Sequence, residues 1–186
     1  MTGVSQSRTP VVALDVDGVL NPALGQAGYT ATPVHVPASA VPDSPFLLGR
    51  GRTDINVTVY VNPAHGSWIN ALREHADVVW ATTWESMAND VLAPLLGIPA
   101  LEVATSVAAD PPWAGYAETT DSAAWKAEVL ADRYRGRPLV WVDDAAWRYE
   151  TLEPGVGEEA DPDEAPWSHD EVVAVLRAGL ALGASR

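Results

Sequence analysis

The sequence predicts an α/β fold in which a parallel sheet is flanked by helices. Short apolar runs alternate along the chain with segments of helical period, as expected for strand–helix–strand crossover units. The apolar runs are continuous rather than alternating with polar residues, which is typical of strands covered on both faces. A length of 186 residues and a hydrophobic fraction of 47% suit a single domain, residues 1–186, with one core.

The individual elements follow from apolar periodicity and from glycine and proline stop signals. The helix expected at 86–97 should stop at Gly97, with Pro99 just beyond it. Strands are expected at residues 10–14, 57–61, 77–83, 100–104 and 138–144, and helices at 66–75, 86–97 and 121–136.

Two segments interrupt the alternation of strands and helices. Residues 22–56 are rich in Pro, Gly, Ala and Thr and lack a helical period, which indicates a small loop and β insertion after the first strand. A hairpin that pairs "TPVHVP" with "VTVYV" is expected there. Residues 153–166 form an acidic connection to a C-terminal helix at about 168–183, where Ser168 and Glu171 form a capping box.

Composition excludes several classes of protein. The formal charge of −14 makes nucleic acid an unlikely partner and disfavours an anionic membrane surface. The chain has no Cys, which excludes disulfides, thiolate catalysis and thiolate metal sites. The first ten residues lack a signal-peptide pattern, and no apolar run approaches the roughly 18 residues that span a bilayer, so we expect a soluble cytoplasmic protein.

Polar side chains gather where the predicted strands end. Ligands of open parallel sheets bind at the carboxyl ends of the strands, so these side chains should share one edge. Two carboxylates about 4 Å apart repel by around 4 kcal/mol at an effective dielectric near 20, and a bound cation relieves that repulsion. With oxygen ligands and no Cys, Mg²⁺ is the expected ion. The residues concerned are Asp15 and Asp17, Thr82 and Thr83, and Asp143 and Asp144.

Four stretches together resemble the motifs of the haloacid dehalogenase-like (HAD) hydrolases. "LDVDGVLN" resembles the first motif, a hydrophobic strand followed by D-x-D-G, and "VVWATT" resembles the second. Lys126 matches the third motif, and "LVWVDD" resembles the fourth. The resemblance covers residues 9–150 and implies a Rossmann-like sheet with the first strand central. The short insertion implies an enzyme with little or no cap, in which 22–56 forms at most a small β-flap.

The resemblance also implies roles for the acidic residues. Asp15 would be the nucleophile that forms an aspartyl phosphate. Asp17 would be the general acid and then the base that activates water, and its backbone carbonyl would touch the metal. Asp143 would complete the Mg²⁺ shell with Asp15, and Asp144 would bind the ion through water or replace Asp143.

The remaining motif residues would bind the phosphoryl group. Thr82 would hydrogen-bond a phosphoryl oxygen, and Lys126 would neutralise the phosphate and restrain Asp15. Lys126 is the only lysine of the chain, although a lysine on a helix often lies on a solvated surface. Gly18 would let the backbone turn so that amide N–H groups face the phosphate. Of the two threonines, one should face the site because strand neighbours point oppositely; Thr82 is preferred over Thr83.

Several side chains near the motifs have two interpretations. Trp84 either stacks on substrate or packs at the base of a loop, and Asn21 either binds substrate or orients a loop. Asp143 and Asp144 can cap a following helix as well as bind metal. His65 is expected in a loop before a helix, as a capping or surface residue.

The predicted function is that of a Mg²⁺-dependent phosphatase acting on a small phosphorylated substrate. Asp17 favours phosphate ester hydrolysis, because the resemblance implies that dehalogenases lack this second aspartate. The alternatives are a catalytically inactive binding domain with the same fold, and a phosphatase domain acting on nucleic-acid ends. D-x-D-G by itself would also fit a simple turn after a strand.

Overall fold

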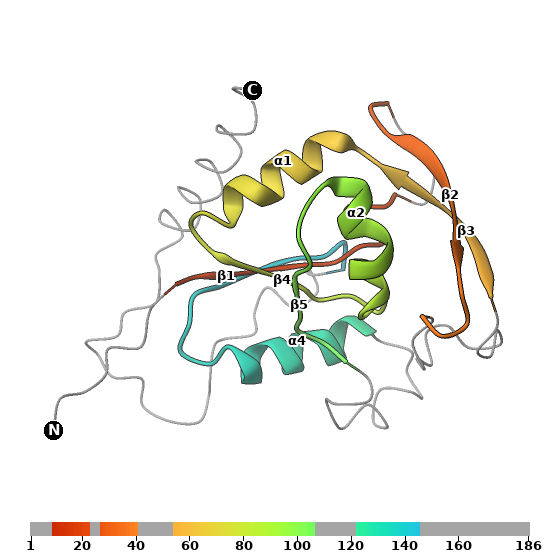
Figure 1. Ribbon diagram of the computed structural model, residues 1–186. Helices are drawn as coiled ribbons and strands as arrows, with labels where there is room; N and C mark the ends of the chain where they lie inside the picture. The colour runs from red at the N-terminus through yellow and green to blue at the C-terminus, as the bar shows by residue number, and fades with distance from the viewer. Residues whose placement is uncertain (1–8, 23–26, 41–53, 107–121, 146–186) are drawn as a thin grey trace, which may run out of the picture.

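A four-stranded parallel sheet forms the centre of the molecule (Figure 1). The computed structural model describes residues 9–22, 27–40, 54–106 and 122–145. The predicted C-terminal helix and the acidic connection before it lie outside these residues. The sheet has the strand order β5-β4-β1-β6, and its strands are β1 (Val11–Leu14), β4 (Asp77–Trp80), β5 (Glu102–Val103) and β6 (Leu139–Val142).

The first strand is central, and its register brings three strand ends to one level. Leu14 lies opposite Trp80 on β4 and opposite Val142 on β6. The residues that follow these three strands therefore emerge side by side at one edge of the sheet. This confirms the α/β class and the central place of the first strand among the described strands.

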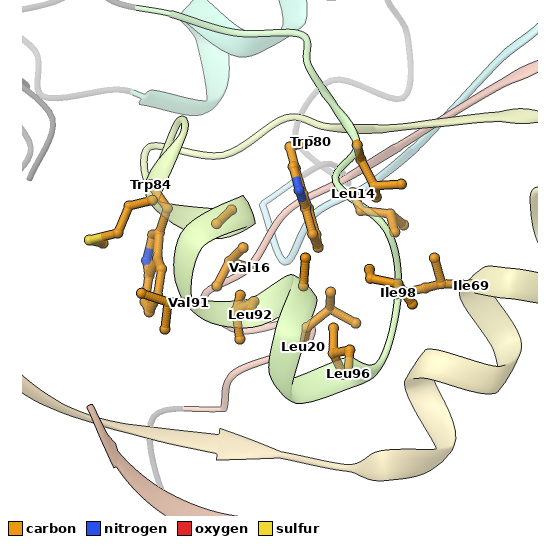
Figure 2. Close-up of a cluster of buried hydrophobic side chains, with 14 of the residues drawn as sticks. Leu14, Val16, Leu20, Ile69, Trp80, Trp84, Val91, Leu92, Leu96 and Ile98 are labelled. Carbon is orange, nitrogen blue, oxygen red and sulfur yellow. The ribbon is translucent and has the colours of Figure 1, made fainter. Parts of the chain in front are cut away.

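Apolar side chains cover both faces of the sheet, as the continuous apolar runs predicted. On β1, Val12 and Leu14 join one core cluster, whereas Val11 and Ala13 join a second cluster on the opposite face. The two faces separate because successive side chains of a strand point to opposite sides. Figure 1 shows helix α1 on one face and helix α4 on the other, and Figure 2 shows the larger cluster, centred on Trp80.

Helix α1 (Pro63–Leu72) begins three residues earlier than the predicted 66–75. The side chain of Asn62 caps it by accepting a hydrogen bond from the backbone N–H of Ala64 at 3.0 Å. Pro63 occupies the first turn, where its missing N–H costs nothing. The prediction of His65 in a loop was therefore wrong: His65 is a buried residue of the first helical turn.

The helix predicted at 86–97 is present as two joined pieces. Residues Ala88–Leu92 form a π-helical turn, η2, and Ala93–Leu96 continue as α2. A wider turn next to Pro94 fits its ring and its missing N–H, which an uninterrupted α-helix does not accommodate. The helix ends at Gly97, as predicted, and the φ of 65° at this glycine is the left-handed conformation common at helix ends.

Helix α4 (Ser122–Arg133) lies within the predicted range 121–136. Its buried residue Leu130, together with Tyr134 just after it, packs on the face of the sheet formed by Val11 and Ala13. Among the described helices, none combines the length and apolar character that crossing a bilayer requires.

The insertion contains the expected antiparallel hairpin, formed by β2 (Thr30–Val36) and β3 (Ile55–Val61). Val34 pairs with Val57, and the apolar face of β3 joins the larger core cluster. The segment predicted as the strand 57–61 is therefore part of this hairpin, and the insertion extends past residue 56. Its alternating burial is that of a sheet with one wet face rather than of a covered parallel strand.

The burial of His65 predicts a loss of stability in acid. Burial lowers the pKa of His65 below its usual 6.5, and among the described residues its Nδ1 has no hydrogen-bond partner. The unfolded chain then binds a proton at this histidine more readily than the folded chain does. The contribution of neutral His65 to the free energy of unfolding is therefore fully present above about pH 6.5, and it is lost as the pH drops through the lower pKa of the folded state. Denaturant unfolding from pH 7.5 to 5 should show wild type losing stability relative to His65→Phe. A difference in stability between wild type and His65→Phe that does not change with pH would contradict this expectation. His75→Phe, which changes an exposed histidine, is the control.

Candidate active site

The side chains at the carboxyl edge of the sheet are held between neighbouring strands. The backbone N–H of Asp15 donates to Val142 O on β6 at 2.9 Å, and Leu14 O accepts from the N–H of Ala81 after β4 at 2.8 Å. Asp15 therefore projects from the centre of the sheet. Asp143 and Asp144 follow β6 directly.

Asp15 is a buried carboxylate with both oxygens engaged. Oδ1 accepts a hydrogen bond from the backbone N–H of Val16 at 2.8 Å, and Oδ2 accepts one from Lys126 Nζ at 2.9 Å. Burial raises the pKa of Asp15 to about 6, with Asp143 adding to the rise, while Lys126 and the Val16 N–H oppose it. A pKa of about 6 leaves Asp15 mostly ionised at neutral pH.

Lys126 reaches the acidic residues from helix α4, on a different layer of the fold. Only 3% of its surface is exposed, so the interpretation as a solvated surface lysine does not hold. Its Nζ contacts both Asp15 and Asp143, and it lies 6.0 Å from the ring centroid of Trp141. Burial alone would lower the pKa of Lys126, but the two carboxylates outweigh burial and raise it, so the ammonium form persists.

Three carboxylates lie close together at this edge of the sheet. Asp15, Asp143 and Asp144 each offer an oxygen, and the three oxygens lie within 4.8 Å of one another. Asp143 also accepts a hydrogen bond from the backbone N–H of Ala145 at 2.8 Å, but the helix that one of the pair was expected to cap lies outside the described residues. With three negative charges facing one positive charge, the cluster retains the charge and the oxygen donors that a divalent cation requires.

Gly18 is packed against Asp144 and has a φ of +79°. A Cβ at this position would lie 2.7 Å from Asp144 Cγ, so alanine is excluded by space as well as by backbone conformation. The N–H of Gly18 donates to Asn21 O at 3.1 Å and so is used within the loop.

Gly18→Ala is expected to displace Asp144 and to destabilise the fold by about 1–3 kcal/mol, the usual range for a non-glycine residue held in this strained conformation. Denaturant unfolding measures the loss. Gly136→Ala is the matched control, because Gly136 has a similar φ of +76°. Among the described residues, no atom beyond its chain neighbours lies within 4 Å of the place that a Cβ would take, so this variant measures the destabilisation from backbone conformation alone. Equal losses for both variants would show that contact with Asp144 is unimportant.

Asp17 is exposed, and its carboxylate is held apart from the acidic cluster. Oδ2 accepts a hydrogen bond from Trp84 Nε1 at 2.8 Å, and Oδ1 accepts one from Asn21 Nδ2 at 2.9 Å. Trp84 is 7% exposed and belongs to the core, so it packs within the protein, as one of its two interpretations had it. Asn21 also accepts a hydrogen bond from the backbone N–H of Tyr60 at 2.9 Å, so both ends of its amide are engaged within the protein.

The two threonines after β4 differ in burial. Thr82 is fully buried and Thr83 is half-buried. Thr82 Oγ1 accepts a hydrogen bond from the N–H of Trp84 at 3.2 Å, and its carbonyl accepts one from Thr105 Oγ1 at 3.4 Å. Both contacts stabilise the turn that carries Trp84.

Sequence reasoning missed Glu85, which has a φ of +46° directly after Trp84. Its side chain accepts a hydrogen bond from Ser106 Oγ at 3.1 Å, which links the ends of β4 and β5. A left-handed glutamate has no sequence signature, because glycine and asparagine usually occupy that conformation.

Comparison of the chain with protein-family models, with curated proteins and with solved structures gave no match. What is established is therefore an α/β protein with a mostly parallel sheet and an acidic cluster with a buried lysine at its carboxyl edge.

Proposed function

We propose that the protein is a HAD-like phosphatase that hydrolyses a small phosphate monoester with Mg²⁺. The observation that carries the proposal is the contact of Lys126 Nζ with both Asp15 and Asp143, since these residues come from three separate segments of the chain. A structural turn after β1 has no need of a buried lysine or of two further carboxylates. The parallel sheet with β1 central supports a Rossmann-like, HAD-like arrangement.

In the proposed reaction, an oxygen of Asp15 attacks phosphorus and the bond from phosphorus to the ester oxygen breaks. Asp17 gives its proton to the departing oxygen, which leaves as an alcohol. Asp17 then takes a proton from water, and the resulting hydroxide attacks phosphorus, releasing inorganic phosphate and regenerating Asp15. Lys126 holds the Asp15 carboxylate in its orientation and offsets the negative charge of the phosphoryl group.

The residues present fit a magnesium ion. Asp15, Asp143 and Asp144 would hold it, with the backbone carbonyl of Asp17, and these are the hard oxygen donors that Mg²⁺ prefers. The ion would supply positive charge where the phosphoryl oxygens gather, which carboxylates alone would repel.

Release of phosphate from phenyl phosphate, measured with Mg²⁺ and with EDTA, tests this function. We expect turnover only with Mg²⁺, and loss of it in Asp143→Asn. Asp132→Asn, which removes an exposed carboxylate paired with Arg135, is the control for the charge change and should keep full activity. Absence of Mg²⁺-dependent release from a broad panel of phosphate esters would contradict the proposal and favour a binding domain.

Binding of the ion should also be visible in the melting temperature. Below about pH 6 Asp15 holds a proton that the ion must displace, so Mg²⁺ should raise Tm more at pH 7.5 than at pH 5. At a concentration about 100 times Kd the stabilisation should approach roughly 2.7 kcal/mol. An equal rise at both pH values, or in Asp143→Asn, would argue against a site at these carboxylates.

A further inference from the structure

Asp17 is held in place by two donors that come from different parts of the fold. The indole N–H of Trp84 binds Oδ2 at 2.8 Å, and the amide of Asn21 binds Oδ1 at 2.9 Å. A carboxylate that is exposed and on a loop would otherwise rotate freely. Two donors, one on each oxygen, fix both the position and the plane of the group.

Trp84 is a rigid donor because its surroundings leave it one orientation. The ring is 7% exposed and is part of the larger core cluster shown in Figure 2, together with Val16 and Val91. Its backbone N–H is bound by Thr82 Oγ1, and the left-handed Glu85 follows it. Core packing and the turn after β4 therefore both direct the indole N–H.

Asn21 is a rigid donor because its other end is also bound. Its Oδ1 accepts a hydrogen bond from the backbone N–H of Tyr60 on β3 at 2.9 Å. Of the two ends of the Asn21 side-chain amide, only the oxygen can accept a hydrogen bond from the Tyr60 N–H. The NH₂ group must therefore be the end that faces Asp17. Asn21 thus connects Asp17 to the β2–β3 hairpin.

We propose that Trp84 and Asn21 are positioning residues that orient the Asp17 carboxyl group toward the leaving oxygen of the substrate. Through Asn21, this orientation also depends on the β2–β3 hairpin being docked in its place. The proposal rests on the phosphatase function proposed above. Neither residue needs to touch substrate for this role. A displacement of about 1 Å at a reacting group can cost about 10²-fold in rate, which is the scale of the expected effect.

The test uses the sensitivity of the reaction to its leaving group. Dinitrophenolate leaves without a proton, whereas phenolate needs one from Asp17, so only the phenyl ester depends on the aim of Asp17. The measured quantity is kcat/KM for phenyl phosphate divided by kcat/KM for 2,4-dinitrophenyl phosphate. This ratio reports the step in which the ester bond breaks, and a general loss of folded protein cancels from it.

Trp84→Phe removes the donor and keeps an aromatic ring, and we expect the ratio to fall about tenfold or more, toward that of Asp17→Asn. Trp80→Phe is the matched control. Trp80 is fully buried in the same cluster, and its Nε1 donates to Asn89 Oδ1 at 2.8 Å, away from the acidic residues. Its ratio should stay within about twofold of wild type, because no contact to Asp17 is lost.

Asn21→Asp provides a second variant that does not depend on repacking the core. Aspartate keeps the acceptor for Tyr60 N–H but replaces the donor to Asp17 with a second carboxylate, so the hydrogen bond that holds Asp17 is lost and the two like charges repel. The ratio should again fall about tenfold or more. The indole N–H signal of Trp84 in an NMR spectrum, assigned by its loss in Trp84→Phe, should exchange slowly with solvent in wild type and rapidly in Asp17→Ala.

The outcomes separate this proposal from the one on which it rests. Active wild type with unchanged ratios in Trp84→Phe and Asn21→Asp would overturn the positioning role and leave the phosphatase intact. Wild type that hydrolyses neither ester would overturn both. A Trp84 indole proton whose exchange is insensitive to Asp17 would show that the contact itself is absent.

Discussion

Asp15→Asn is expected to reduce phosphate release by about 10³-fold or more, because the amide oxygen is too weak a nucleophile to attack phosphorus. The change should leave the fold intact. Lys126 keeps Asp143 as its partner, and an asparagine oxygen can still accept from the N–H of Val16. Initial rates of phosphate release with Mg²⁺, together with a melting curve, measure both properties.

The chemical claim behind this prediction is a covalent intermediate at Asp15. Acid quenching during turnover followed by mass spectrometry should find a phosphoryl group on the peptide containing Asp15 in wild type, and none in Asp15→Asn. Asp132→Asn again controls for loss of one negative charge. An Asp15→Asn variant that retains more than about a tenth of the wild-type rate would rule out Asp15 as the nucleophile.

Lys126→Met should have the largest effect on stability, a loss of about 3–5 kcal/mol at pH 7.5. Methionine fills the space of the lysine stem, but Asp15 and Asp143 then lose the ammonium group that both contact, while Asp144 lies close to them. Activity should be lost as well. Arg135→Met is the control: it breaks an exposed ion pair with Asp132, and surface changes of this kind usually stay within about 0.5 kcal/mol.

The pH dependence of the Lys126→Met variant identifies the cause of its instability. In wild type the pKa of Asp15 is already raised to about 6, with Lys126 holding it down. Without Lys126 the pKa of Asp15 rises further, so the destabilisation should be greatest well above pH 6 and should shrink as the pH falls toward 6, because below that value Asp15 is protonated in both folded proteins. Adding Asp15→Asn to Lys126→Met should restore part of the stability at pH 7.5. A loss of stability independent of pH would indicate packing rather than charge.

Most of the parallel sheet could be predicted from local pattern. The runs ending at Leu14, Trp80 and Val142 are apolar at nearly every position, which requires cover on both faces and hence a parallel sheet. The end of α2 at Gly97 was equally clear. Helix α1 starts before its apolar period does, at the capping signals of Asn62 and Pro63, so the period alone predicts too late a start.

The hairpin shows where pattern was ambiguous. "VTVYV" reads equally well as a covered strand and as one strand of a hairpin, since both contain β-branched residues. Its pairing with β2 decided the matter, and pairing across the 18 residues between the two strands is a property of the folded chain.

The carboxylates at the strand ends were predictable from the chain alone, because strand ends are set by short-range sequence and parallel strands end at one edge. The contact of Lys126 with Asp15 was expected only from the resemblance and not from local pattern, since it joins residues 111 positions apart through the packing of α4 on the sheet. The contacts of Trp84 and Asn21 with Asp17 depended on tertiary structure even more. Only the packed core determines which atom accepts a hydrogen bond from the indole N–H of Trp84. Likewise, only the docked hairpin determines which end of the Asn21 amide faces Asp17.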